Sequence, residues 1–271
     1  MSYLPDGYLQ LSPLRFLPDS DVGLWSSYSG ALDAEGYLVA SVGSLLVEAG
    51  ERALLVDAGF GPVSEPAERT PAELGAIRCG ALLDSLAGVG RDPASIEAVA
   101  FTHLHDDHVG WARTGSPFAN ATWLVPAEEV RHALATAGFL PLGEPEDRVR
   151  PVEAGEEVFP GVSALPTPGH TPGHCSYVVE VGGVRIVVIG DVMHSPVQVA
   201  RHDLRAASDW HPELGRATRR RLLGRLEADG SVGFAVHFGS VVFGRVERAG
   251  SVLAWRGSDP VPPEATGGEE P

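Results

Sequence analysis

The chain has 271 residues, of which 44% are hydrophobic, so it is long enough to bury a substantial core as one large domain. Its formal net charge of −16 argues against a nucleic-acid partner and against anionic membranes, because their phosphates would be repelled. Two cysteines, Cys79 and Cys175, are too few for a disulfide framework. With neither a leader-like start nor a membrane-spanning run recognisable, we expect a cytoplasmic protein.

The N-terminal third is expected to hold two strands and a helix. Residues 1–30 mix Pro, Gly, Ser and aromatic residues without clear periodicity. Residues 37–47 and 53–57 follow as two predicted strands joined by a turn. Residues 62–76, rich in Pro, Glu and Thr, indicate a surface loop, and the apolar spacing over 80–88 predicts a helix that ends at glycine.

The most informative stretch is His103-Leu104-His105-Asp106-Asp107-His108. It directly follows residues 96–101, an apolar run that predicts a buried strand. His103 and His105 can lie on one side, because alternate residues of an extended chain share a face. Asp107 and His108 follow in the turn and can point elsewhere. Imidazoles and a carboxylate this dense suit two adjacent cations better than one; the alternative is a polar loop of exposed histidines.

Beyond this motif we expect a strand at 121–125 and a helix that begins at Pro126. Residues 139–157 are rich in Pro, Gly and charge, which indicates a lid or variable insertion. The tail, residues 257–271, has the composition of a disordered segment.

A second informative run is Thr167-Pro168-Gly169-His170-Thr171-Pro172-Gly173-His174. Proline fixes φ and glycine admits close approach, so a histidine in this loop is held with little freedom. Residues 184–189 predict a buried strand followed by Asp191, which by itself could be a helix cap or turn residue. An Arg-rich helix over 216–225, interpreted as a solvated face, precedes a strand that ends near His237.

The His-x-His-x-Asp-His motif after a strand resembles the signature of the metallo-β-lactamase superfamily, and the other motifs of that family follow in order between about residues 35 and 250. The resemblance implies an α/β fold, a four-layer αββα sandwich of two mixed β-sheets flanked by helices. It also implies that residues 1–256 form a single domain, with the N-terminal 30 residues near the pocket or at a dimer contact.

Carried over residue by residue, the resemblance implies a site for two divalent metal ions, zinc by expectation, with manganese, iron or cobalt as alternatives. It assigns the ligands as follows: His103, His105 and His170 to one ion, Asp107, His108 and His237 to the other, and Asp191 as the bridge. His174 is expected to support the ligands from behind. Asp57 could do the same or simply begin a Gly-rich turn.

The resemblance is strongest to the branch with acyl-homoserine lactonases and methyl-parathion-hydrolase-like enzymes. It implies a bridging hydroxide that attacks a carboxylic ester or lactone, or alternatively a phosphotriester. Lactonases commonly have Tyr where this chain has His194, which could donate a hydrogen bond to an oxyanion, protonate a leaving group, or merely support Asp191. Asp107 and His194 are the candidate catalytic residues.

A neutral, partly apolar small-molecule substrate is expected, because the candidate pocket residues are apolar. These are Trp25, Tyr28, Trp111, Phe118 and Phe139. β-Lactam hydrolysis is disfavoured because neither cysteine occupies a ligand position, and nuclease activity because the chain is acidic. An iron-dependent redox enzyme and a non-catalytic metal-binding protein are the alternatives from other classes. Apolar loops near the N-terminus would suit a homodimer.

Overall fold

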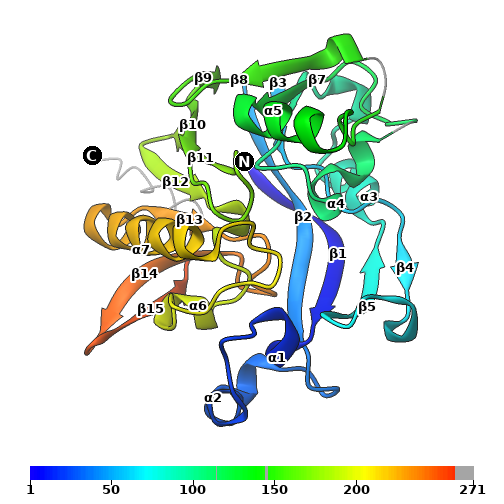
Figure 1. Ribbon diagram of the computed structural model, residues 1–271. Helices are drawn as coiled ribbons and strands as arrows, with labels where there is room; N and C mark the ends of the chain where they lie inside the picture. Colours follow the sequence, from blue (N-terminus) through cyan, green and yellow to red (C-terminus); the bar gives the residue numbers. More distant parts are fainter. Residues whose placement is uncertain (114, 144–145, 260–271) are drawn as a thin grey trace, which may run out of the picture.

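Two β-sheets packed face to face form the centre of the protein (Figure 1). The structure is a computed structural model that describes residues 1–113, 115–143 and 146–259. The strands are β1 (Ser2–Leu11), β2 (Leu38–Ala49), β3 (Arg52–Val56), β4 (Ser64–Glu65), β5 (Leu74–Cys79), β6 (Ala98–Ala100), β7 (Thr122–Pro126), β8 (Val149–Val152), β9 (Glu157–Phe159), β10 (Val162–Pro166), β11 (Cys175–Val181), β12 (Val184–Val188), β13 (Val232–Phe234), β14 (Phe243–Ala249) and β15 (Val252–Gly257).

The helices lie on the outer faces of the two sheets and at one end of the molecule (Figure 1). The α-helices are α1 (Pro13–Phe16), α2 (Val22–Ser27), α3 (Leu82–Gly88), α4 (Asp106–Val109), α5 (Ala127–Thr136), α6 (Val197–Ala200) and α7 (Pro212–Asp229). Within the described residues, no helix is both long enough and apolar enough to cross a bilayer.

The first sheet has the strand order β4-β5-β1-β2-β3-β6-β7-β8. Its N-terminal part is antiparallel, whereas β3, β6, β7 and β8 run parallel. Val56 at the end of β3 pairs with Ala100 at the end of β6. The carboxyl ends of neighbouring parallel strands meet at one edge. The residues that follow β3 and β6 therefore emerge side by side.

The second sheet has the strand order β15-β14-β13-β12-β11-β10-β9. Its one parallel pair in the described chain, β12 with β13, aligns Val188 with Phe234, so Asp191 and His237 follow adjacent strand ends. The loop of residues 167–174 joins β10 to β11 at the same end of this sheet. The topology thus collects four histidine- or aspartate-bearing segments at one end of the two sheets.

The hydrophobic core lies between the sheets and includes Leu45, Leu54 and Tyr177, all buried completely. Outside it, Leu82 and Leu86 of α3 pack against the first sheet, and the leucines of α7 pack against the second. Each such side chain contributes about 1.5–3 kcal/mol by leaving water. The order helix, sheet, sheet, helix confirms the predicted four-layer αββα architecture.

The structure corrects three predictions from the sequence. Residues 1–30 include β1, a ten-residue strand inside the first sheet, which lacks clean alternation because Pro5 and Gly7 form an irregularity against β2. Residues 62–76, expected as a loop, contain β4 and the start of β5. Residues 139–157, expected as a lid or variable insertion, contain the edge strand β8. Residues 144–145, and 260–271 of the predicted tail, lie outside the described residues.

Candidate metal centre

The histidine motif emerges from the end of β6, where the chain leaves the buried sheet and enters the short helix α4. His103 and His108 are buried, whereas His105 and Asp107 are partly exposed. Because the chain turns at α4, His108 points back toward the sheet. The motif therefore presents side chains to two separate places, as the spacing predicts.

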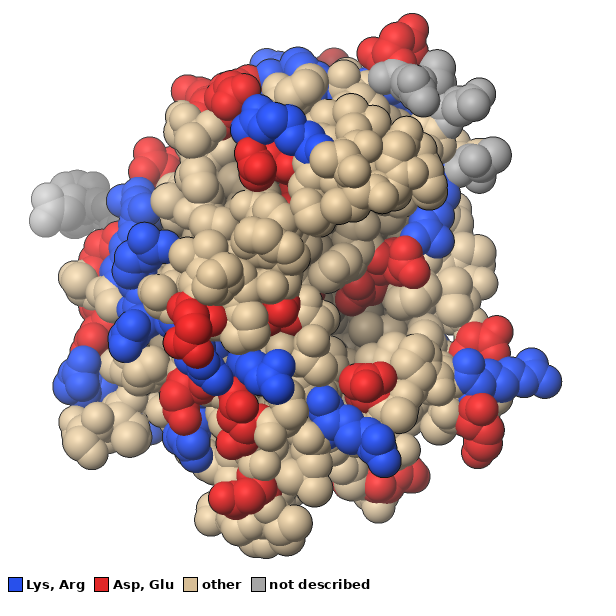
Figure 2. Space-filling model, viewed as in Figure 1, with Lys and Arg blue, Asp and Glu red and all other residues tan. Residues whose placement is uncertain are grey.

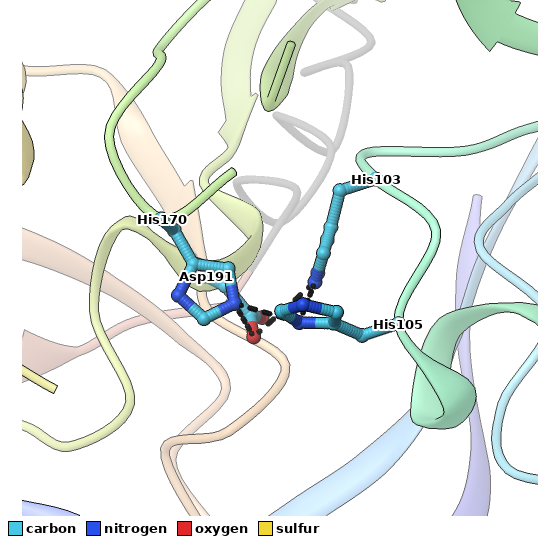
Figure 3. Close-up of side chains that lie close together, drawn as sticks. All are labelled: His103, His105, His170 and Asp191. Carbon is cyan, nitrogen blue, oxygen red and sulfur yellow. Dashed lines mark hydrogen bonds and ion pairs between the residues drawn. The ribbon is translucent and has the colours of Figure 1, made fainter. Parts of the chain in front are cut away.

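One group of side chains comprises His103, His105, His170 and Asp191 (Figure 3). The Nδ1 atom of His105 lies 2.9 Å from Nε2 of His103 and 2.9 Å from Nε2 of His170. The Oδ2 atom of Asp191 lies 3.1 Å from Nε2 of His170 and 3.6 Å from Nε2 of His103. Three segments, the histidine motif after β6, the loop between β10 and β11 and the residues after β12, thus aim four ligand atoms at one point. We call these residues the first group.

Asp107, His108 and His237 form the second group. The Oδ2 atom of Asp107 lies 3.8 Å from Nε2 of His108 and 3.6 Å from Nε2 of His237. The other carboxylate oxygen of Asp191, Oδ1, lies 3.0 Å from each of these two nitrogens. Asp191 therefore turns one oxygen toward each group.

The donor set fits a pair of metal ions. Although Nε2 of His108 and Oδ1 of Asp191 are 3.0 Å apart, they do not align as a hydrogen bond, and each is a buried polar atom without a hydrogen-bond partner in the described part of the protein. Buried polar atoms are seldom left in this state. In the second group, imidazole nitrogens and carboxylate oxygens therefore converge without donating to one another, and zinc takes ligands of this kind.

The protonation states of His103 and His105 agree with this fit. Burial lowers the pKa of His103 well below its ordinary value, and burial with the neighbouring His170 lowers the pKa of His105 to about 4. Both rings are then neutral at pH 7, the form that binds metals. For His170, burial alone would lower the pKa, but the carboxylates of Asp191 and Asp209 together outweigh burial and raise the pKa to about 9. Asp191 thus attracts positive charge to the place where a cation would lie.

Asp57 supports the second group through His108. Its Oδ2 accepts a hydrogen bond from Nδ1 of His108 (2.8 Å), and its Oδ1 accepts one from the backbone N–H of Thr102 (2.7 Å). Among the described residues, Asp57 is the one non-glycine residue with a positive φ, 62°. Such a backbone costs of order 1–3 kcal/mol and persists at functional sites where the surroundings fix it. Of the two sequence-based readings of Asp57, the geometry favours support of the ligands.

His174 lies behind Asp191. Burial, with a contribution from His170, lowers the pKa of His174 to about 3, so its ring is neutral. Its Nε2 accepts a hydrogen bond from the backbone N–H of Asp191 (2.9 Å), while Nδ1 lies 2.9 Å from Oγ1 of Thr167. The ring therefore fixes the segment that carries Asp191 against the loop that carries His170.

Three buried carboxylates that the sequence analysis did not single out also hold the site. Asp6 accepts hydrogen bonds from the backbone of Phe60 and from Nε1 of Trp111. Glu129 accepts from Thr171 and Gly173 beside His170, and Asp209 lies 3.2 Å from Nδ1 of His170. Each comes from a segment distant in sequence with no motif around it, so only the fold could reveal these contacts.

His194 lies at the junction of the two groups. Its Nε2 is 3.1 Å from Oδ2 of Asp191, and its ring stacks on that of His237 with 5.5 Å between centroids. Phe16 contacts the ring by its edge, at 5.0 Å. Nδ1 of His194 is buried and has no hydrogen-bond partner among the described residues. The structure thus brings His194 to the groups predicted from the sequence.

A cavity of about 400 Å³ opens over the two groups, and Figure 2 shows the face of the molecule that is hollowed, with acidic side chains at its edge. Its lining combines residues of both groups with His194 and an apolar wall. The apolar wall consists of Leu9, Leu11, Phe16, Ala40, Phe60, Leu74 and Leu104.

The five aromatic residues predicted for the pocket are not among the described residues that line this cavity, so that prediction is wrong. Trp25 and Phe118 are buried in hydrophobic clusters, and Tyr28 packs at the edge of the first of these. Trp111 turns its Nε1 to Asp6, and Phe139 is 61% exposed. The wall comes instead from β1, β2 and the segments near them, because β1, missed from the sequence, passes beside the metal groups.

Comparison with known proteins adds a family match. The model of the metallo-beta-lactamase superfamily matches residues 39–237. An N-acyl homoserine lactonase from a Bacillus species is 34% identical over 100 residues, which are 36% of this chain and 39% of that protein. The chain therefore matches about two fifths of the length of the curated relatives.

Solved structures match over nearly the whole chain. AidC, a dizinc quorum-quenching lactonase in complex with its product N-hexnoyl-L-homoserine, has a TM-score of 0.77 at 19% identity, covering 94% of this chain and 92% of that one. AbOPH, a hydrolase in the beta lactamase superfamily, has a TM-score of 0.74 at 26% identity, covering 95% and 93%. At such identities the likeness to AidC establishes the fold alone.

Proposed function

The chain belongs to the metallo-β-lactamase superfamily, and from this premise we propose that it is a hydrolase that binds two divalent metal ions and cleaves a carboxylic ester or lactone of a neutral, partly apolar small molecule. The observation that carries the proposal is the position of Asp191, which turns one carboxylate oxygen toward each ligand group. The relatives named as lactonases favour the lactone within this class.

We assign the ligands as follows: His103, His105 and His170 to one ion, Asp107, His108 and His237 to the other, and Asp191 to both. Zinc is the proposed metal, because these nitrogen and oxygen ligands suit it and no cysteine is among them. When bound, such ions polarise a carbonyl oxygen and lower the pKa of water to about 7, which supplies a nucleophile at neutral pH.

The other residues of the cavity bind and orient the substrate. The apolar wall that includes Leu9, Phe16 and Phe60 would bury the apolar part of the substrate and exclude water from that side. The imidazoles lie at the base of the cavity, so the polar end of the substrate, which contains the reacting carbonyl group, would lie against them. A neutral ester with one apolar arm therefore matches the lining better than a charged substrate would.

His194 is the candidate proton donor at the base of the cavity. Its Nε2 faces the Asp191 carboxylate and the two ligand groups, whereas its Nδ1 is buried. We therefore assign the proton on Nε2 as the one that a substrate or leaving-group oxygen beside Asp191 would accept. A hydrogen bond from this position would stabilise negative charge on that oxygen as the bond to carbon breaks. Asp107 supplies the second group with a carboxylate that lies beside His108 and His237.

A panel of N-acyl lactones, aryl esters and aryl phosphotriesters tests the proposal, assayed with zinc-loaded protein and with chelator-treated protein. We expect turnover of lactones or esters that is lost with the metal and restored by zinc. Turnover of phosphotriesters alone would replace the ester with the alternative substrate class. Absence of turnover across the panel by protein that contains two zinc ions would refute the proposed function.

Measurement of metal content in protein purified without added metal separates zinc from the alternatives. Histidine and carboxylate ligands also suit iron. Stoichiometric iron with oxygen-dependent activity would indicate a redox enzyme on the same fold instead of a hydrolase.

A further inference from the structure

Arg219, in the middle of α7, is buried. The sequence predicts a solvated face for the arginines of this helix, but Arg219 is 1% exposed. Its Nε donates a hydrogen bond to the carbonyl oxygen of Val192 (2.8 Å). Its Nη1 donates to the carbonyl oxygens of Leu204 (2.5 Å) and His202 (3.2 Å). A guanidinium withdrawn from water in this way requires an anion nearby, and the anion here is Asp209.

Asp209 connects Arg219 to a proposed ligand. Its Oδ2 lies 3.6 Å from Nη2 of Arg219 and accepts a hydrogen bond from the backbone N–H of Ala206 (3.0 Å). Its Oδ1 lies 3.2 Å from Nδ1 of His170. A proton on Nδ1 that is donated to Asp209 leaves Nε2 of His170 free for the first group, since the partner of one ring nitrogen fixes the role of the other.

The backbone around Asp209 ties the same segment to the loop of His170. The N–H of Trp210 donates to the carbonyl oxygen of His170 (2.9 Å), and the N–H of His211 donates to that of Gly169 (2.9 Å). A Cβ on Gly169 would lie 2.4 Å from Cα of Gly215, so the loop packs directly against the start of α7. The loop is therefore held from the same helix that carries Arg219.

Arg219 also acts on the second ligand-bearing segment. Val192, whose carbonyl accepts the hydrogen bond from Nε, directly follows Asp191. We propose that Arg219 is a positioning residue that couples two segments of the metal centre, acting on His170 through Asp209 and on Asp191 through the carbonyl group of Val192. This inference rests on the metal centre of the proposed function. It requires that loss of Arg219 weaken metal binding although no ligand is removed.

The test measures zinc binding in folded Arg219→Met, Arg219→Lys and Asp209→Asn variants by competition with a chromophoric chelator, together with zinc stoichiometry. We expect zinc affinity to fall by about 10–100-fold in Asp209→Asn, the usual effect of losing a partner behind a ligand. Arg219→Met should lose at least as much, because both segments are affected. Arg219→Lys keeps the charge without the fork of three hydrogen bonds, and it serves if the Met variant does not fold.

A matched control is Arg220→Met, the same change one residue along the same helix, where the side chain is exposed. Its zinc affinity should equal that of the wild type. A purely structural role for Arg219 would lower the unfolding temperature of the zinc-free protein and leave the zinc affinity of the folded protein unchanged. That outcome in the Arg219 and Asp209 variants would overturn the inference.

Double variants that combine each change with His170→Ala separate the route through Asp209 from the route through Val192. Asp209→Asn should have no further effect on zinc affinity once His170 is absent, whereas Arg219→Lys should keep a residual effect through Val192. Equal effects of Asp209→Asn with and without His170 would refute the route through Asp209. A wild-type protein that takes up no zinc would instead refute the metal centre itself, so the two failures are distinguishable.

Discussion

The two ligand groups share Asp191 but are supported by different parts of the protein. The second group rests on Asp57, which follows β3 in the same sheet as the histidine motif and contacts His108 directly. The first group rests on Asp209, which belongs to the connection before α7 and is itself paired with Arg219. One support is thus built next to the motif, and the other is built from a distant helix.

This difference has an electrostatic side. Asp209 has a permanent cation, Arg219, beside it, whereas Asp57 contacts Thr102 and the ring of His108. The second group also includes the carboxylate of Asp107, whereas the first has only the share of Asp191. The second group is therefore the more anionic of the two. We expect the second group to retain a divalent cation longer during chelation, because a cation is attracted more strongly to carboxylates whose negative charge is not neutralised by a neighbouring cation.

Removal of Asp191 should abolish the difference in metal retention between the two groups, because both groups share its carboxylate. We expect Asp191→Ala to lower activity by at least about 10³-fold, because the several kcal/mol that a metal site supplies to the transition state correspond to this factor. Metal content should fall for both groups. The control is Asp203→Asn, because this aspartate is exposed and pairs with Arg201. An Asp191→Ala protein with two tightly bound ions would contradict the assignment of the bridge.

Asp107→Asn should affect the second group alone. The neighbouring residue, Asp106, is 66% exposed at its side chain and pairs with Arg113, so Asp106→Asn is a matched control for metal content. We expect the Asp107 variant to retain one ion after dialysis against a chelator and the Asp106 variant to retain two. Emission spectroscopy of the dialysed proteins provides the count. Equal loss from the two variants would show that the motif acts only through its overall charge.

Asp57→Ala should weaken the second group without removing a ligand, by about 10–100-fold in metal affinity. Backbone strain complicates this change, because φ of residue 57 is 62°. Asp57→Gly removes the same carboxylate but tolerates the positive φ. If the carboxylate matters for metal binding, the two variants should have equal metal affinity and differ only in stability. A Gly variant with wild-type metal affinity would assign Asp57 to the turn instead.

The sequence predicts the residues of the metal centre that belong to short local motifs. It does not predict the supporting residues that come from distant segments. Proposed ligands were recognisable because the motif and the Thr-Pro-Gly-His run have characteristic spacings, and Asp57 because it ends an apolar strand. Nothing around Asp209 or Arg219 distinguishes them from surface residues until α7 packs on the second sheet. The pocket residues were mispredicted for a related reason: β1 has an irregular register, so its alternation did not reveal Leu9 and Leu11.

The smallest expected effect concerns the loop that carries His170. Glu129, buried at the start of α5, accepts hydrogen bonds from Thr171 and from the N–H of Gly173 (2.8 Å). Glu129→Ala would leave the buried hydroxyl of Thr171 and the half-buried N–H of Gly173 without this partner, which should lower the free energy of unfolding by about 1–3 kcal/mol. Denaturant titration of the metal-free protein measures it, with Glu128→Ala, the exposed neighbour, as the control.

Glu129→Gln sharpens this test, because the amide oxygen can still accept both hydrogen bonds while the charge is lost. Stability close to that of the wild type would assign the role of Glu129 to hydrogen bonding. A loss of stability as large as that of Glu129→Ala would show that the negative charge of Glu129 is needed. In either case zinc affinity should change less than in the Asp209 variants, because Glu129 contacts the loop beside His170 and not its ring. A larger change in zinc affinity would mean that loop rigidity, more than the contact with Nδ1, holds the first group together.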